Sequence, residues 1–274
     1  METYSGHLSK MATTLAEPVQ YEMCLDQLRV PMNTYLGRTI GLTFSGRIEC
    51  AGCGRKIKKS YHQGYCYPCT QTLAECDTCI VRPELCHFAQ GTCRQPDWGE
   101  ARCMKPHYVY LANSSGIKVG ITRETQIPTR WIDQGAIQAL PILKVGTRLV
   151  SGLSEVLFKR HVADKTNWRK MLKGEVEERD LVAARDELME KCRPGLEELV
   201  AEHGPDAVTP LPEATETRLD FPVLEFPTKV TSLNLDKTPE IGGVLKGIKG
   251  QYLILSTGVI NIRKYGGYHV TFSA

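Results

Sequence analysis

Nine of the eleven cysteines lie between Cys50 and Cys103, and this cluster constrains the fold more than any other feature of the sequence. Cys50 with Cys53, and Cys66 with Cys69, form pairs with two residues between the thiols, and twelve residues separate the pairs. Such spacing lets four thiolates surround one ion tetrahedrally, as structural Zn²⁺ requires. Because four thiolates leave no open position for a substrate, we predict a zinc ribbon with a structural zinc.

A second set of cysteines follows the first and supplies more candidate ligands than one zinc ion needs. The candidates are Cys76, Cys79, Cys86, Cys93 and Cys103, with His87 and His107 beside them. We predict a second zinc bound by Cys76 and Cys79 and by two of Cys86, Cys93 and Cys103. The alternative is one ribbon followed by spare buried cysteines, so the expected content is one or two zinc ions.

The composition is typical of a globular protein, with 42% hydrophobic and 24% charged residues in a chain of 274. No apolar run approaches the ~18 residues that a transmembrane helix needs. The N-terminal sequence METYSGHLSK has no apolar core behind a basic start, so we expect no signal peptide. We therefore expect a cytoplasmic protein without membrane contact, in a reducing compartment where clustered cysteines are metal ligands rather than disulfides.

Charge is unevenly distributed along the chain. Residues 104–174 contain twelve Lys or Arg against four Asp or Glu, a net charge of +8. Residues 175–225 contain five Lys or Arg against fifteen Asp or Glu, a net charge of −10. A basic stretch is typical of proteins that neutralise phosphates, so DNA or RNA is the predicted partner. The alternative is a globule with two differently charged solvated faces.

The loop between the first two cysteine pairs, GRKIKKSYHQGY, combines cations with aromatic rings. Cations bind phosphates and rings stack on bases, and nucleic-acid-binding loops use both. The predicted nucleic-acid-binding residues are Arg55, Lys56, Lys58, Lys59 and Tyr61 in this loop, and Arg123 further along the chain. The alternative is a solvated hairpin whose aromatic residues cover the zinc.

Periodicity and composition divide this α+β chain into five segments. They are a β-rich segment over 1–49, the cysteine-rich ribbon region over 50–106, strands and helices over 107–173, acidic helices with a linker over 174–221, and a β-rich segment over 222–274. The apolar positions expected to share a strand face are Val19, Tyr21 and Met23 in one strand, and Ile40, Leu42 and Phe44 in another. We expect the two terminal segments to pair and form one small barrel or sandwich, because chain termini often lie close together. Pro194 and Gly195 predict a break between two acidic helices.

Residues 107–173 resemble the GIY-YIG nuclease superfamily. HYVYLANSSGIKVGIT predicts a hairpin whose strands stand where that superfamily has its Gly-Ile-Tyr and Tyr-Ile-Gly strands. The matching positions are Tyr108-Val109-Tyr110 for the first strand, Lys118-Val119-Gly120 for the second, Arg130-Trp131 for the helical Arg, Glu155 for the metal-binding Glu and Asn167 for the Asn that follows it. The resemblance implies a small mixed sheet flanked by helices.

The same resemblance implies a phosphodiesterase whose catalytic residues are Tyr110, Lys118, Arg130, Glu155 and Asn167. Tyr110 would deprotonate or orient the attacking water, and Arg130 would neutralise charge that develops in the transition state. Glu155 would hold Mg²⁺ or Mn²⁺. Lys118 departs from the superfamily, which has a second Tyr at that position.

Most of the chain also resembles a family of uncharacterised bacterial proteins with cysteine-rich N-terminal halves. The segments CDTCIVRPELCHFAQGTCRQPDWGE and SSGIKVGITR carry this resemblance, which implies no activity. Three functions stay open: a metal-dependent nuclease, a DNA- or RNA-binding module without cleavage, and a zinc-stabilised scaffold for protein contacts.

Overall fold

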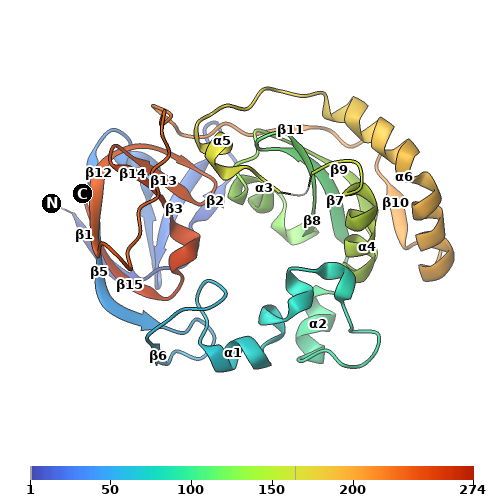
Figure 1. Cartoon of the computed structure of the whole chain (residues 1–274), viewed down its shortest axis with the longest axis horizontal. Coiled ribbons are helices and arrows are strands. Elements are labelled where there is room, and N and C mark those ends of the chain that lie inside the picture. Colours follow the sequence, from blue (N-terminus) through green and yellow to red (C-terminus); the bar gives the residue numbers. More distant parts are fainter. Residues whose placement is uncertain (1, 164) are drawn as a thin grey trace.

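The computed structural model describes residues 2–163 and 165–274, and it has an α+β fold as the sequence predicts. Figure 1 shows two bodies built on sheets, one from the two chain ends and one from the middle of the chain, with the cysteine-rich segment beneath them. Within the described ranges, no helix is long and apolar enough to span a membrane.

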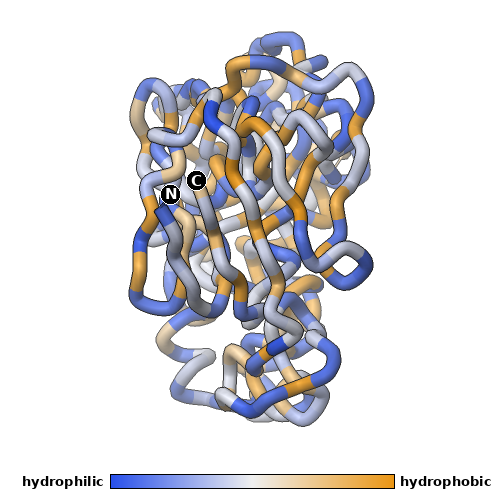
Figure 2. Tube along the Cα trace, turned by 90° about the vertical axis from the view of Figure 1, so that its left-hand side faces the viewer, coloured by the Kyte–Doolittle hydropathy of each residue, from blue (hydrophilic) through white to orange (hydrophobic). Residues whose placement is uncertain are grey.

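Both ends of the chain build the larger sheet. Its strands follow the order β1 (Thr3–His7), β15 (Tyr268–Ser273), β5 (Thr39–Glu49), β12 (Glu240–Lys249), β13 (Tyr252–Leu255) and β14 (Gly258–Asn261), with β6 (Lys56–Ile57) added to β5. In this register Tyr4 lies opposite Phe272, and Phe272 lies opposite Leu42. The two termini therefore lie side by side, as Figures 1 and 2 show.

The terminal strands do not close into the predicted small barrel. Within the described residues, β1 and β14 are the two ends of the strand order and do not pair with each other. A separate sheet instead supplies strands β2 (Ala12–Thr14), β3 (Gln20–Leu25) and β4 (Leu28–Pro31). The core is shared between the two sheets, so burial of apolar surface does not require the last strand to meet the first.

Alternation along the strands decides which side chains enter this core. Most residues of the predicted strand faces are buried, with Val19, Tyr21 and Met23 at most 1% exposed and Ile40 and Leu42 each 2% exposed. Phe44, the third residue predicted on the face of Ile40 and Leu42, is only half-buried. Figure 2 shows the same alternation as changes of hydropathy along neighbouring strands. Successive side chains of a strand point to opposite faces, which is why a period of two specifies the buried set.

The middle of the chain builds the second sheet. Its strand order is β10 (Val208–Pro210), β9 (Gln138–Val145), β7 (His107–Asn113) and β8 (Ile117–Arg123), with β11 (Thr217–Arg218) also paired to β9. These ladders are antiparallel, and one isolated parallel bridge joins Lys118 to Ala163. The helices of this part are α3 (Thr129–Asp133), α4 (Arg148–Phe158), α5 (Trp168–Leu172) and α6 (Leu181–His203).

The predicted break in the acidic helices is wrong, because α6 is one continuous helix of 23 residues that includes Pro194. A proline inside a helix removes one backbone hydrogen bond at a cost of ~3 kcal/mol. Burial of Leu188, Cys192 and Leu196 on one face of α6 offsets this cost. Gly195 lets α4 approach closely, since a β-carbon there would lie 2.7 Å from Cδ2 of Leu157.

The cysteine-rich segment is packed against both sheet bodies. It contains α1 (Tyr67–Thr72), α2 (Pro96–Arg102) and three 3₁₀ helices, Ala74–Cys76, Thr78–Ile80 and Pro83–Leu85. At the terminal sheet, a β-carbon on Gly266 would lie 2.3 Å from the carbonyl oxygen of Gln63. At α4, a β-carbon on Gly152 would lie 2.3 Å from the backbone nitrogen of Glu84. Close backbone contacts thus hold the segment at each end.

Candidate metal centre and nuclease-like site

The four cysteines of the first two pairs converge on one point. Sulfur atoms of Cys50, Cys53, Cys66 and Cys69 all lie within 4.8 Å of one another, and 3.8 Å separates Sγ of Cys53 from Sγ of Cys66. Two sulfur atoms at ~2.3 Å from a tetrahedral zinc are ~3.8 Å apart. The donor set and spacing therefore fit a structural zinc, as the sequence predicts.

Backbone groups around these thiols favour the thiolate form that binds metal. The backbone N–H of Cys66 donates to Sγ of Cys50 over 3.1 Å. The backbone N–H of Arg55 is the main cause that lowers the pKa of the Cys53 thiol to about 6. The Arg55 side chain also donates to Cys53, and this contact raises the pKa of the guanidinium. Arg55, predicted to bind nucleic acid, is thus engaged at the metal centre.

A second cluster of thiols differs from the predicted ligand set. Cys79, Cys86 and Cys103 are buried together, and Cys93 lines the same small cavity between Phe88 and Trp98. A hydrogen bond with Cys103 lowers the pKa of Cys86 to about 6 and raises the pKa of Cys103, which shows that the two sulfur atoms are in contact.

Cys76 does not line this cavity. It is buried, and burial raises its pKa to about 11, with smaller contributions from Glu75 and from the thiols Cys50 and Cys66 of the first site. Cys76 therefore lies within electrostatic reach of the first metal centre without belonging to it. The oxygen, sulfur and nitrogen ligand atoms of Asp77, Cys79 and His87 also lie within 4.8 Å of one another. Of the predicted ligands for a second ion, Cys79, Cys86 and Cys103 are buried in one cluster and Cys93 lines the same cavity, but these thiols do not form a group within 4.8 Å as the first four do.

Two charged side chains of the nuclease-like segment act on the hydroxyl group of Tyr110. Tyr110 is fully buried on β7, and its hydroxyl donates to Oε1 of Gln134 over 3.2 Å. Burial raises the pKa of Tyr110, while Arg130 from α3 lowers it through charge and a hydrogen bond, and Glu155 from α4 raises it. Arg130 and Glu155 therefore both lie within electrostatic reach of the Tyr110 hydroxyl.

Glycine and tryptophan neighbours hold the Tyr110 ring in place. Gly120 is the register partner of Tyr110 on β8, and a β-carbon there would lie 2.7 Å from both Cζ and Oη of the ring. Trp131 contacts the ring edge-to-face with centroids 6.0 Å apart. Gln134 was not predicted from the sequence, because nothing in the residue pattern distinguishes it from a solvated helix end.

The other predicted catalytic residues have different environments. Lys118 lies on β8 and is 4% exposed. The carboxylate of Glu155 pairs with Nζ of Lys159 over 3.2 Å, one turn further along α4. Asn167 is exposed and caps α5, where its side-chain oxygen accepts from the backbone N–H of Lys170 over 3.2 Å. Asn167 thus has a helix-capping contact and no contact here with Tyr110, Arg130 or Glu155 among the described residues.

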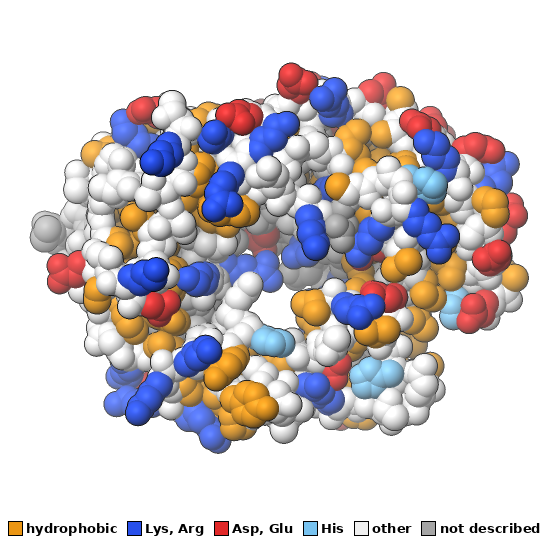
Figure 3. Space-filling view, viewed as in Figure 1, with side chains coloured by type: hydrophobic (Ala, Val, Ile, Leu, Met, Phe, Trp, Pro, Cys, Tyr) orange, Lys and Arg blue, Asp and Glu red, His pale blue; other side chains and the backbone are white. Residues whose placement is uncertain are grey.

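Basic side chains surround the centre of the molecule. Figure 3 shows a recess in the face in view, with Lys and Arg side chains around its rim. In the ribbon loop, Lys56, Lys58 and Lys59 are exposed, and Nζ of Lys59 lies 5.1 Å from the centre of the Tyr61 ring. Tyr67, which the sequence did not single out, is 60% exposed and contacts Tyr61 edge-to-face at 5.9 Å.

Arg123, the remaining predicted nucleic-acid-binding residue, ends β8 in a basic environment. Burial lowers the pKa of its guanidinium, and the neighbouring charges of Arg102 and Arg148 lower it further. Arg148 itself donates to the carbonyl oxygens of Cys79 and Ile80, over 3.3 and 2.6 Å, and so ties the second thiol cluster to α4.

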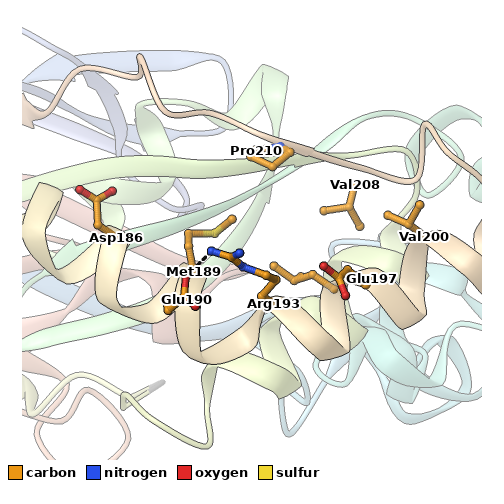
Figure 4. Close-up of a pocket in the computed structure, with 9 residues that line it drawn as sticks. Asp186, Met189, Glu190, Arg193, Glu197, Val200, Val208 and Pro210 are labelled. Carbon is orange, nitrogen blue, oxygen red and sulfur yellow. Dashed lines mark hydrogen bonds and ion pairs between the residues drawn. The ribbon is translucent and has the colours of Figure 1, made fainter.

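A separate groove lies on the acidic helix. It has a volume of about 520 Å³ and is formed by α6 and β10 (Figure 4). Apolar side chains such as Met189, Val200 and Val208 line it, with Asp186 and Glu197 among its charged residues. None of the predicted site residues lines this groove.

Comparison with known proteins identifies a family for most of the chain. No curated protein and no solved structure matches the sequence. A family model described as "Protein of unknown function (DUF2797)" matches residues 37–270. This match agrees with the broader resemblance to an uncharacterised family. No family model of the GIY-YIG superfamily or of a zinc ribbon matches the chain. The chain therefore belongs to the DUF2797 family.

Proposed function

We propose that the protein binds nucleic acid and hydrolyses a phosphodiester bond with the help of a divalent metal ion. One observation carries the proposal: Arg130 and Glu155, from two separate helices, both lie within electrostatic reach of the Tyr110 hydroxyl. A proton-transfer group, a cation and a carboxylate are the groups that metal-assisted phosphodiester hydrolysis uses. The exposed lysines of the ribbon loop and the basic rim of the recess support a polyanionic partner (Figure 3).

Each residue has a role that follows from its environment. Because burial raises the pKa of Tyr110, its hydroxyl stays protonated at neutral pH and orients the attacking water rather than deprotonating it. Arg130 neutralises charge on the phosphate in the transition state. Glu155 would hold Mg²⁺ or Mn²⁺ after its ion pair with Lys159 opens, and the bound ion polarises the phosphate.

The zinc centre has a different role in this proposal. Four thiolates saturate the ion, so it stabilises the ribbon and presents the basic loop without taking part in the chemistry. The thiols of the second cluster would hold a second structural zinc. A cytoplasmic location fits both sites, because a reducing compartment keeps the thiols available for metal.

Binding without cleavage is the second candidate function. Lys118 replaces a superfamily tyrosine and is almost fully buried, and Glu155 is already paired with Lys159. Both features favour a site that binds phosphate but turns it over slowly. The third candidate, a scaffold for protein contacts, uses the groove on α6 shown in Figure 4.

A cleavage assay separates these functions. The purified protein is incubated with Mg²⁺ or Mn²⁺ and with single-stranded, double-stranded and branched DNA, and with RNA. We expect Glu155→Gln and Tyr110→Phe to lower the rate by ~100-fold or more, as loss of a positioned acid–base or metal-binding group does. Glu198→Gln, on the exposed face of α6, is the matched control and keeps full activity.

The possible outcomes point to different functions. Cleavage that survives both substitutions would refute the assignment of the site. Salt-sensitive binding without cleavage selects the binding module. Absence of binding at low salt leaves the scaffold as the supported function.

A further inference from the structure

The terminal sheet body is docked against the helix that carries Arg130. Asp133, three residues after Arg130 on α3, accepts from Nζ of Lys10 over 2.9 Å and from Nε2 of Gln251 over 2.8 Å. The side-chain oxygen of Gln251 also accepts from the backbone N–H of Met11 over 2.8 Å. Residues from both ends of the chain therefore converge on α3.

This junction brings a second guanidinium toward the nuclease-like site. The backbone carbonyl of Gln251 accepts from the backbone N–H of Ile262 over 2.9 Å, and Arg263 follows directly in the 3₁₀ helix Ile262–Tyr265. Arg263 is half-buried. Burial lowers the pKa of its guanidinium, and the charge of Arg130 lowers it further while Asp133 raises it. Arg263 and Arg130 therefore repel each other across the junction.

Neither of these two cations has an ion-paired carboxylate of its own among the described residues. Across residues 2–163 and 165–274, neither Arg130 nor Arg263 forms an ion pair within 4.0 Å. The nearby Asp133 raises the pKa of Arg263, but its ion pair is with Lys10. Two partly desolvated guanidiniums of like charge, neither with an ion-paired carboxylate of its own, are stabilised when an anion binds to both.

We propose that Arg130 and Arg263 together bind one phosphate group at the junction of the two sheet bodies. Guanidinium groups match phosphate because each offers a planar fork of N–H donors. Arg130 also contacts the Tyr110 hydroxyl, so the bound phosphate lies beside the residues of the proposed function. Arg263 then acts as a substrate-binding residue that the terminal segment supplies to a site otherwise built by residues 107–173.

We call the pair Arg130 and Arg263 the phosphate clamp. That the clamp serves the nuclease-like site rests on the proposed function, whereas its binding of phosphate does not. The ligand class is a phosphate diester or monoester within an oligonucleotide, or inorganic pyrophosphate as its simplest probe. Coupling of the two bodies through one phosphate would also make anion binding stabilise their junction. This consequence is measurable without any turnover.

Thermal denaturation with inorganic pyrophosphate tests the clamp directly. We expect pyrophosphate to raise the Tm of the full-length wild-type protein, and Arg263→Gln and Arg130→Gln each to abolish the shift. Lys264→Gln is the matched control, because it removes one positive charge from the neighbouring exposed position. It keeps the shift. An Arg263→Gln protein that shifts like Lys264→Gln overturns the proposal.

Oligonucleotide binding gives the second readout. Arg263→Gln is expected to weaken binding of a single-stranded oligonucleotide ~10-fold and to reduce the salt slope by about one, while Lys264→Gln changes both less. If the wild-type protein binds no nucleic acid yet keeps the pyrophosphate shift, the proposed function fails and the phosphate clamp stands. If Arg263→Gln does not fold, Arg263→Lys replaces it. That variant keeps the charge but loses the fork, and an undiminished shift would again overturn the proposal.

Discussion

Gly120 lies opposite Tyr110 in the β7–β8 hairpin, and the tyrosine ring occupies the space where a side chain at position 120 would stand. A β-carbon on Gly120 would lie 2.7 Å from both Cζ and Oη of Tyr110. The glycine therefore sets the direction in which the hydroxyl points, toward Gln134 and Arg130. A residue without a side chain thus shapes the candidate site.

Replacement of Gly120 by alanine tests this relationship. We expect Gly120→Ala to lower the free energy of unfolding by about 1–3 kcal/mol, the usual cost of overpacking a buried site. It should also abolish any activity that depends on Tyr110. Gly146→Ala is the control, since its β-carbon would meet only the carbonyl oxygen of Asp206 at 3.9 Å. Equal stability of the two variants in urea denaturation would contradict the packing argument.

Metal analysis tests the zinc centre. We expect Cys53→Ser to lose about one zinc ion per chain relative to wild type and to lower the Tm, because ribbon folding depends on the metal. Cys76→Ser is the informative partner, since Cys76 lines neither set of converging thiols, and it should keep the full zinc content. Zinc loss in Cys76→Ser would restore the ligand set predicted from sequence.

His107 makes stability depend on pH. Burial lowers the pKa of His107 to about 4 from its ordinary value of 6.5, and its Nδ1 lies 2.7 Å from the carbonyl oxygen of Lys105. Between pH 6.5 and 4 the unfolded chain binds a proton that the folded protein does not. The free energy of unfolding should therefore fall as the pH drops through this window, by up to ~3 kcal/mol.

The control for this pH effect is His107→Asn, whose amide can still donate to Lys105. Acid also releases zinc from thiolates, but both proteins lose it alike, so the difference between them isolates the histidine. Denaturation curves from pH 7 to pH 4 should show the wild-type protein losing stability relative to His107→Asn. Parallel curves would mean that His107 binds its proton over the same pH range in the folded protein as in the unfolded chain.

The exposed tyrosine of the ribbon is expected to stack on an unpaired base. Stacking of a base on an aromatic side chain contributes ~1–3 kcal/mol, so Tyr67→Ala should weaken single-stranded binding ~5- to 100-fold. Duplex DNA, whose bases are stacked internally, should be affected less. Val81→Ala, at a position 77% exposed, serves as the control. An equal loss for single strand and duplex would assign Tyr67 a structural role instead.

Local patterns predicted much of the candidate site. Alternation in residues 1–49 identified the buried faces that include Tyr21 and Leu42, since strand side chains alternate regardless of the partner strand. The hairpin that places Tyr110 opposite Gly120 also followed from local turn and strand signals. The closed barrel was wrong, because strand closure depends on how two sheets share one core.

Long-range packing decided what sequence alone did not. The continuous helix α6 tolerates Pro194 because its buried face packs against the second sheet body. Cys76 lies outside the cavity that the thiols of the second cluster line, although its spacing to Cys79 predicted that site. In each case a local preference of a few kcal/mol or less was outweighed by apolar burial elsewhere.

By itself the sequence determined the convergence of Cys50, Cys53, Cys66 and Cys69, because short knuckles fix thiol positions through local backbone geometry. Only the tertiary structure decided that Arg263 approaches Arg130, since 133 positions along the chain separate them and no local rule relates them. That approach depends on both chain ends meeting in one sheet and docking on α3. Contacts between distant segments arise from the packing of whole elements, which a residue pattern does not encode locally.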